Sequence, residues 1–209
     1  MDKPTIELYC GDCLEYMKSI PGKGVVVVID PPYGVRWNTD YRRFTTGFNV
    51  EGQNHKKVEG DNQPFDPAPF LQFDKVVIFG ANCFSNKLPC GSWFVWDKRF
   101  DNGTTFLADG EVAWYSKGHG VYIKSVTQQG CIRPEPIQHP TQKPVEIMKW
   151  IIEKITKPGD IIFDGYMGSG TTGVACKLLR RNFIGCEIDP KYFELARRRI
   201  DSTEFGMFE

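Results

Sequence analysis

A short, wholly apolar segment followed by two prolines is the feature that most constrains this chain. Val25–Ile29 contains only β-branched residues, and such a run is typical of a strand buried inside a parallel sheet. Asp30-Pro31-Pro32-Tyr33 follows at once, so these residues are expected in the loop at the carboxyl end of that strand. Because ligands of open α/β sheets bind at that edge, the four residues form a candidate binding or catalytic turn.

The chemistry of this turn favours one kind of ligand. Two prolines remove two backbone donors and fix two φ angles, and each residue that precedes a proline is pushed toward an extended conformation. The Asp30 carboxylate and the Pro31 carbonyl can then point at one place, with the Tyr33 ring beside them. Two acceptors and an aromatic plane suit a flat ring with an exocyclic amino group. The alternative is an ordinary proline turn with a solvated Asp30 and a packed Tyr33, and the rest of the chain argues against it.

Predicted strands and helices alternate along the chain. Apolar runs predict strands at 6–9, 25–29, 75–79, 92–96, 111–115, 160–164 and 183–187. Helical spacing of apolar residues predicts a short helix at 14–20 and longer helices at 144–157, 169–180 and 190–200. The alternation predicts a doubly wound, mostly parallel α/β sheet. Residues 116–138 are predicted to be irregular.

Composition limits the class of protein. The chain has 209 residues, 41% of them apolar, which suits a single domain with a substantial core. Lys plus Arg and Asp plus Glu each number 26, so any basic surface must be local. The seven cysteines have no regular spacing, and no signal peptide or membrane-length apolar run is present. These features predict a cytoplasmic protein with free thiols, no metal and no membrane contact.

A glycine-rich turn joins the predicted strand at 160–164 to the next helix. Gly168, Gly170 and Gly173 have the G-x-G-x-x-G spacing of a dinucleotide-binding turn. Glu187 follows about 20 residues later, where an acid binds ribose hydroxyls. NAD is therefore one candidate ligand. An ATP-binding P-loop is excluded because Thr171 stands where that motif requires lysine.

S-adenosylmethionine is the second candidate ligand of this turn. It shares ribose and adenine with NAD but carries a zwitterionic amino acid in place of the phosphates. Asp164 lies in the turn itself, where it would repel a pyrophosphate and accept a hydrogen bond from an ammonium group. Few residues follow Gly173, so the remaining strands of the fold must come first. The sheet is therefore predicted to be circularly permuted, with the amine-binding half before the cofactor half.

In this order of motifs the chain resembles the permuted β group of DNA amino-methyltransferases, over roughly residues 5–200. The resemblance is carried by Asp30-Pro31-Pro32-Tyr33, His139-Pro140-Thr141-Gln142-Lys143-Pro144 and Asp164-Gly165-Tyr166-Met167-Gly168-Ser169-Gly170-Thr171-Thr172. The cofactor turn of the family usually reads Asp-Pro-Phe, and this chain has Gly165 and Tyr166 in place of the last two. Its small size resembles enzymes of this pattern that phages encode.

The resemblance implies one Rossmann-like methyltransferase domain over residues 1–209, of the kind found in restriction-modification. It has a catalytic half at 5–115, a short target-recognition insert at 116–138 and a cofactor half at 139–200. Lys143 is expected to pair with the methionine carboxylate of S-adenosylmethionine. The residues implied in cofactor binding are Asp12, His139, Thr141, Lys143, Asp164, Gly165, Gly168, Gly170, Thr171, Thr172 and Glu187.

The implied reaction transfers a methyl group from S-adenosylmethionine to N6 of a flipped adenine in double-stranded DNA. Asp30 and the Pro31 carbonyl would accept the amino hydrogens, Pro32 would stiffen the turn, and Tyr33 would stack on the base. N4-cytosine methylation is an alternative, although similar enzymes more often carry serine at the position of Asp30. An RNA substrate, a protein-glutamine methyltransferase (typically with asparagine before Pro-Pro-Tyr) and an NAD-binding protein are the others.

DNA contacts are expected in the polar segment that leaves the catalytic turn. The candidates are Arg36, Trp37, Arg42, Arg43, Lys56 and Lys57. The insert at 116–138 has few side chains that could read base edges, so a short recognition sequence of about two to four base pairs is expected. A homodimer would double that footprint, and the sequence leaves it open.

The basic residues after the catalytic turn give a prediction about salt. If Arg42 and Arg43 neutralise phosphates, the logarithm of DNA affinity should fall with the logarithm of salt concentration by about 0.9 per phosphate. Replacing both arginines with glutamine should flatten that slope and leave sequence preference unchanged. Titrations of labelled duplex at several salt concentrations measure both, and an unchanged slope would place the DNA elsewhere.

Overall fold

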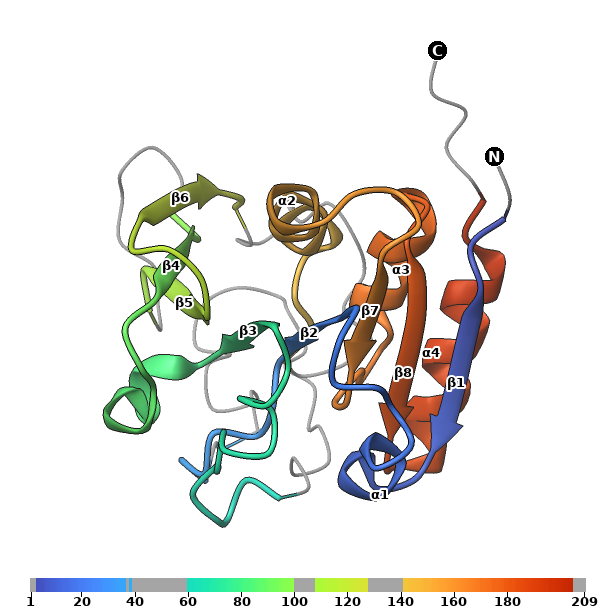
Figure 1. Ribbon diagram of the computed structural model, residues 1–209, viewed down its shortest axis with the longest axis horizontal. Coiled ribbons are helices and arrows are strands. Elements are labelled where there is room, and N and C mark those ends of the chain that lie inside the picture. Colours follow the sequence, from blue (N-terminus) through green and yellow to red (C-terminus); the bar gives the residue numbers. More distant parts are fainter. Residues whose placement is uncertain (1–2, 37, 39–59, 100–107, 128–140, 205–209) are drawn as a thin grey trace, which may run out of the picture.

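The computed structural model describes residues 3–36, 38, 60–99, 108–127 and 141–204. Within these ranges the strands form one sheet in the order β1-β8-β7-β2-β3-β5-β4-β6 (Figure 1). The strands are β1 (Ile6–Cys10), β2 (Val25–Ile29), β3 (Lys75–Phe79), β4 (Ser92–Asp97), β5 (Gly110–Tyr115), β6 (Val121–Ser125), β7 (Ile161–Asp164) and β8 (Asn182–Glu187). The predicted α/β fold with a mostly parallel sheet is therefore confirmed.

Strand β2 occupies the middle of the sheet. All five of its residues are buried, as its apolar composition predicts. Val26 and Val28 pack into one core layer, and Val25, Val27 and Ile29 pack into the layer on the opposite face. β2 pairs in parallel with β3 on one side and with β7 on the other. This position places the residues after Ile29 between the ends of two parallel neighbours.

The strand directions bring most strand ends to one edge. β1, β8, β7, β2 and β3 run in parallel, and β5 is antiparallel to both β3 and β4. β6 runs parallel to β4. Every described strand except β5 therefore ends at the same edge, and β5 begins there. We call this the carboxyl edge of the sheet.

Strand β6 corrects the expectation that residues 116–138 are irregular. Val121 and Ile123 are 63% and 66% exposed, so the apolar side chains of this short strand are not enclosed by the core. It forms because its backbone pairs with β4, in a register that places Trp93 opposite Val121. Residues 121–125 of the predicted recognition insert therefore belong to the sheet.

Aspartate side chains cap the N-terminal ends of two of the α-helices in the described ranges. They are α1 (Cys13–Met17), α2 (Val145–Ile155), α3 (Thr171–Leu178) and α4 (Pro190–Ser202). Asp12 caps α1 and Asp189 caps α4, each accepting a hydrogen bond from a backbone N–H two residues later. Pro144, expected as the first helical residue, is instead the extended residue before α2.

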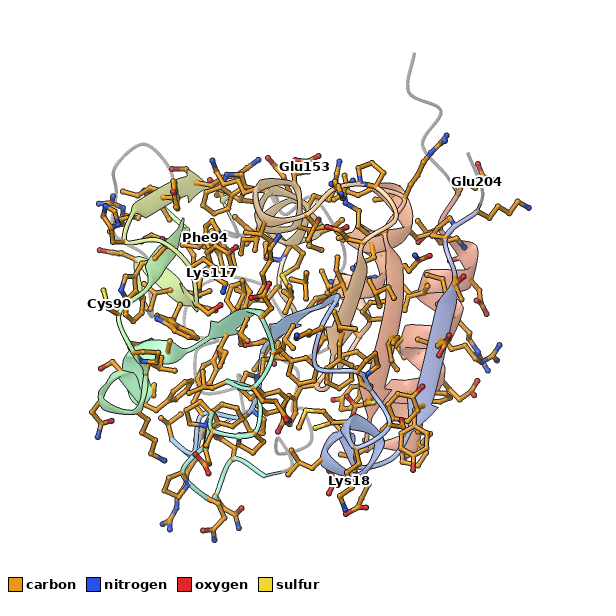
Figure 2. The ribbon with its side chains drawn as sticks, viewed as in Figure 1. Lys18, Cys90, Phe94, Lys117, Glu153 and Glu204 are labelled. Atoms are coloured by element: carbon orange, nitrogen blue, oxygen red, sulfur yellow. The ribbon has the colours of Figure 1, made fainter. Side chains whose placement is uncertain are left out.

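Two layers cover the two faces of the sheet. Buried residues of α2, α3 and α4 pack on one face, and α2 lies beside α3 (Figure 1). Phe94 extends from β4 toward α2, where it meets the Trp150 ring edge-on with centroids 5.3 Å apart (Figure 2). On the other face α1 packs together with Phe65, Phe70 and Phe73. The sheet is thus enclosed, and its carboxyl edge is left for a site.

Two further properties follow from the described residues. None of their helices combines the length and the apolar character that a membrane span requires. The six cysteines in these ranges are all free thiols.

The packing of α2 can be tested by truncation. Ile151 is 1% exposed and lies on the buried face of α2, so Ile151→Ala should lower the free energy of unfolding by about 2–5 kcal/mol. Ile123→Ala, at a side chain that is 66% exposed, should cost less than about 1 kcal/mol. Urea denaturation of both variants gives the comparison, and equal losses would contradict this packing.

Candidate functional site

The carboxyl edge gathers the polar residues that the sequence singles out. Asp30 follows β2, Asp164 ends β7 and Glu187 ends β8. These three strands are related through β7, which pairs with both of the others. Asp12 follows β1, and the backbone N–H of Gly11 donates to the Glu187 carbonyl at 2.9 Å. The predicted catalytic turn and the predicted cofactor turn therefore lie side by side.

The predicted catalytic turn is held by hydrogen bonds to both oxygens of Asp30. The Tyr33 hydroxyl donates to Oδ1 at 2.6 Å, and Lys143 Nζ donates to Oδ2 at 2.5 Å. Burial and the neighbouring Asp30 charge raise the pKa of Tyr33 well above its ordinary value, so its hydroxyl stays protonated and donates. The Asp30 carboxylate is thereby fixed in one orientation.

Gly80, at the end of β3, makes room for the Tyr33 ring. Its φ of 66° is left-handed, and a Cβ there would lie 2.1 Å from Cε1 of Tyr33. A side chain at this position would therefore displace Tyr33 from Asp30. The stacking of Tyr33 on a base remains a prediction; the structure places its ring against Gly80 and its hydroxyl on Asp30.

Lys143 is enclosed by acidic and aromatic groups. Its side chain is 5% exposed, and Nζ lies 2.5 Å from Asp30 Oδ2 and 3.1 Å from Glu111 Oε2. Burial alone would lower the pKa of Lys143, but the two carboxylates raise it above its ordinary value. Its ammonium thus stays charged. Pairing of Lys143 with the cofactor carboxylate remains a prediction, and here its partners are within the chain.

The charge of Lys143 lowers the pKa of both Asp30 and Glu111, but the net shifts of the two carboxyl groups differ in direction. Burial raises the pKa of Asp30, and the charge of Lys143 opposes that rise. Burial also acts to raise the pKa of Glu111, but Lys143 and Lys98 outweigh it and lower the value to about 2. Glu111 therefore remains ionised. Our reading of the sequence missed Glu111 and Lys98, although an acid in the apolar run of β5 was a signal.

The glycine turn surrounds a buried carboxyl group. Asp164 is 2% exposed; its Oδ1 accepts from the Tyr166 N–H at 3.0 Å and its Oδ2 from the Thr172 hydroxyl at 2.5 Å. Burial raises the pKa of Asp164 to about 7, and these two hydrogen bonds offset the rise only in part. The Thr171 hydroxyl accepts a hydrogen bond from Arg199 at 3.0 Å, which ties the turn to α4.

Glu187 is anchored by backbone donors. Its Oε2 accepts from the Gly168 N–H and its Oε1 from the Asp189 N–H, each at 2.9 Å. Because each carboxylate oxygen has two acceptor positions, Glu187 keeps acceptor capacity for a ligand. The hydrogen bond from Gly168 to Glu187 holds the glycine turn after β7 against the end of β8.

The departure at Gly165 and Tyr166 has a packing explanation. A Cβ at Gly165 would lie 2.9 Å from Cβ of Cys13, so α1 approaches the turn too closely for a larger residue. Tyr166 keeps an aromatic ring at the second position, which packs near Phe65 and Phe70. Both residues therefore fit the packing around this turn.

Some of the remaining predicted site residues lie in the described ranges and others lie outside them. Asp12 accepts from the Leu14 N–H at 2.8 Å, and the Thr141 carbonyl lies 3.5 Å from Lys143 Nζ. Arg36 is exposed, and its N–H donates to the Asp61 carbonyl at 3.0 Å. The predicted residues outside the described ranges are Trp37, Arg42, Arg43, Lys56, Lys57 and His139.

Comparison with protein families and sequences identifies relatives. The family model described as "DNA methylase" (N6 and N4 methyltransferases) matches residues 110–198. The type II methyltransferase M2.DpnII of Streptococcus pneumoniae is 48% identical over 65 residues, which are 31% of this chain and 24% of that protein. The match thus spans about a quarter of that relative. The type II methyltransferase M1.MboII of Moraxella bovis is 24% identical over 93% of this chain and 96% of its own length.

Solved structures give the same result. The complex of M1.HpyAVI with SAM has a TM-score of 0.54 and 25% identity, covering 93% of this chain and all of that one. The PvuII cytosine-N4-specific DNA methyltransferase has a TM-score of 0.61 at 16% identity, covering 98% and 89% of the two chains, which is a likeness of fold. Together these findings confirm the predicted resemblance and the predicted Rossmann-like fold.

The buried carboxyl of Asp164 makes stability depend on pH. Its pKa of about 7 in the folded protein lies above the value of about 4 in an unfolded chain. The folded state therefore holds the extra proton, and stability should fall as pH rises from about 4 to 7, by up to about 1.4 kcal/mol per pH unit. Asp164→Asn has no carboxyl to ionise and should flatten part of this fall.

Urea denaturation of the ligand-free protein at pH 5 and pH 8 measures that difference. Asp66→Asn, at an exposed aspartate, serves as the control and should keep the wild-type dependence. Burial also raises the pKa of Asp30 and of Glu187, so some pH dependence should remain in Asp164→Asn. A dependence identical to that of the wild type would rule out the proposed protonation of Asp164.

Proposed function

We propose that this chain, which has the fold and motif order of the DNA amino-methyltransferases, transfers a methyl group from S-adenosylmethionine to N6 of adenine in DNA. One observation carries the proposal: a fixed, partly buried carboxylate after β2 lies beside a glycine turn after β7 and an anchored acid after β8. Those are the places where an amine and a nucleoside cofactor would meet at a sheet edge.

The glycine turn fits S-adenosylmethionine better than NAD. Glu187 is held by two backbone donors and keeps acceptor positions for ribose hydroxyls. Asp164 lies in the turn with a pKa of about 7, so near neutral pH its carboxyl carries a partial negative charge that disfavours a pyrophosphate and suits an ammonium. The residues that would hold the cofactor are Asp12, Asp164, Gly168, Gly170, Thr172 and Glu187. When bound, the cofactor supplies an electrophilic methyl group on a sulfonium.

The chain then has to make an aromatic amine react. The lone pair of such an amine is delocalised into the ring, so the nitrogen is a poor nucleophile. Asp30 Oδ1 and Oδ2 each keep an acceptor position beyond the bonds to Tyr33 and Lys143. A hydrogen bond from the amino group to Asp30, with a second to the Pro31 carbonyl, would localise the lone pair and stabilise the positive charge that develops on nitrogen.

Positioning supplies the other part of the rate. The adenine must leave the duplex at a cost of about a few kcal/mol, and nitrogen, methyl and sulfur must then lie in line. The rigid turn limits how far Asp30 can move, because Tyr33 and Lys143 hold both of its oxygens. Fixing two reactants in this way can contribute up to about 7–11 kcal/mol to the lowering of a barrier.

N4-cytosine methylation is the second candidate function. Its support is the likeness of fold to the cytosine-N4-specific PvuII enzyme. Both reactions use an exocyclic amine, so the general chemistry is the same. Asp30 in the first position of the catalytic turn favours adenine, since the enzymes that act on cytosine more often carry serine there.

Double-stranded DNA is the proposed substrate, with a short recognition sequence. β6 takes residues 121–125 of the segment expected to read bases, which leaves fewer positions for base contacts. Reading many base pairs needs many such contacts, each worth about 1–3 kcal/mol. A monomer with this insert should therefore distinguish only a few positions.

The decisive test combines an assay of the product with a variant of Asp30. Labelled S-adenosylmethionine and unmethylated DNA should yield N6-methyladenine after digestion to nucleosides, whereas N4-methylcytosine would establish the second candidate. Asp30→Asn and Asp30→Ala should bind S-adenosylmethionine in calorimetry yet transfer methyl at least about a hundredfold more slowly.

Calorimetry also tests the cofactor. Glu187→Ala should weaken S-adenosylmethionine binding, and NAD should give no heat. The control Asp66→Asn should match the wild type in both assays. Near-normal turnover in Asp30→Asn would refute the role of that carboxylate, and NAD binding without S-adenosylmethionine binding would restore the dinucleotide interpretation.

A further inference from the structure

Four charged residues of alternating sign form a row along the carboxyl edge. Asp30 pairs with Lys143 at 2.5 Å, Lys143 lies 3.1 Å from Glu111, and Glu111 pairs with Lys98. They come from the ends of β2 and β4, the start of β5 and the segment before α2. We call these four residues the charge row. Lys98 lies at the far end of the row, and the side chains of Lys143 and Glu111 separate it from the proposed catalytic carboxylate of Asp30.

The antiparallel direction of β5 is what places Glu111 in the row. Glu111 is the second residue of β5, opposite Trp96 near the end of β4. If β5 ran parallel to its neighbours, its first residues would lie at the other edge of the sheet. Lys98 follows β4 and stacks over the Trp96 ring at 4.7 Å, which fixes its ammonium beside Glu111.

Lys143 needs more than one negative partner at this depth. Its side chain is 5% exposed, and a buried ammonium is stable only when it is paired. Glu111 Oε2 is buried and lacks a hydrogen bond of good geometry, although it lies 3.1 Å from Nζ. Its contact with Lys143 is therefore an ion pair that acts through charge.

The charge on Lys143 has a consequence for Asp30. A lone cation at 2.5 Å would draw negative charge away from the amino group that Asp30 has to bind, and would weaken the carboxylate as an acceptor. A second carboxylate on the far side of the cation reverses part of that effect. Glu111 occupies that position, and the ammonium of Lys98 partly offsets the charge of Glu111.

We propose that Glu111 is a positioning residue for the proposed methyl transfer: it holds Lys143 in place and offsets its charge, so that Asp30 remains a strong acceptor. This role rests on the proposed function. Asp30 faces Tyr33 from its own turn, Lys143 from the segment before α2, Glu111 from β5 and Asp164 from β7. Among these groups, Glu111 is the one that touches Lys143 without touching Asp30 in the described contacts.

The pH dependence of turnover distinguishes this role from simple packing. Burial raises the pKa of Asp30, Lys143 lowers it, and Glu111 raises it again. Glu111→Gln removes the last effect, so the acid limb of kcat should move to lower pH. The plateau of kcat should fall about ten- to a hundredfold, because a less basic Asp30 is a weaker acceptor. KM for DNA should stay close to wild type.

Lys98→Gln should move the acid limb in the opposite direction. Removing that cation leaves the charge of Glu111 less compensated, so the pKa of Asp30 should rise. The matched control is Glu194→Gln, the same substitution in an exposed ion pair with Arg197 at 2.8 Å on α4, which should leave the limb unmoved. A limb that stays fixed in both Glu111→Gln and Lys98→Gln, or moves the same way in both, overturns the proposal.

A second measurement does not depend on activity. Acetic anhydride labelling followed by mass spectrometry reports how well the Lys143 amine is protected. Glu111→Gln should raise the rate of Lys143 acetylation several-fold, whereas Glu194→Gln should not. An unchanged rate would refute the positioning role even with an active enzyme. If the wild type transferred no methyl group, faster acetylation in Glu111→Gln would still support the placement of Lys143 and the proposed function alone would fail.

Discussion

The ion pair between Asp30 and Lys143 joins residues 113 positions apart, and the arrangement of the site depends on it. It fixes the carboxylate after β2 against the segment that leads into α2. α2 is in turn followed by β7 and the glycine turn. A single contact thus holds the proposed amine-binding half of the chain to the proposed cofactor half, at the edge where the proposed reaction requires the two ligands to meet.

The same contact carries an energetic cost that other residues offset. Removing an ammonium from water is unfavourable by several kcal/mol, so the chain supplies two carboxylates, a hydroxyl and the face of Phe79 at 5.3 Å. The buried charge is then balanced, but only while these groups keep their positions around the ammonium. Such an arrangement contributes little net stability, and its value lies in holding one acceptor in one direction.

Much of the fold and part of the site could be predicted from the sequence. The apolar run of β2, the double proline after it and the spacing of Gly168, Gly170 and Gly173 are local signals, and each has a direct physical meaning. The permuted order followed from where the glycine turn lies in the chain. The same reasoning missed β6, because Val121-Tyr122-Ile123 favours a strand but is a run of only three apolar residues.

The partners of Lys143 were also beyond the sequence. Its positive charge suggested a negative partner, and a cofactor carboxylate was the obvious choice. Within the chain the structure places Asp30 and Glu111 beside Lys143, and Glu111 arrives through an antiparallel strand whose direction no local pattern reveals. Gly80 is a similar case, since the reason that a Cβ cannot fit there is the ring of Tyr33, which is distant in sequence.

The order of strands also decides when this protein can fold. β7 and β8 lie between β1 and β2 in the sheet, so the first two strands made are not joined in one sheet until nearly the whole chain exists. Until then β1 lacks its partner β8, and the edge of β2 that later meets β7 is unpaired; contacts of such long sequence separation form slowly. The nascent chain therefore has to remain unaggregated with part of its apolar core exposed. Completion of the sheet is a late event, which α3, β8 and α4 finish together.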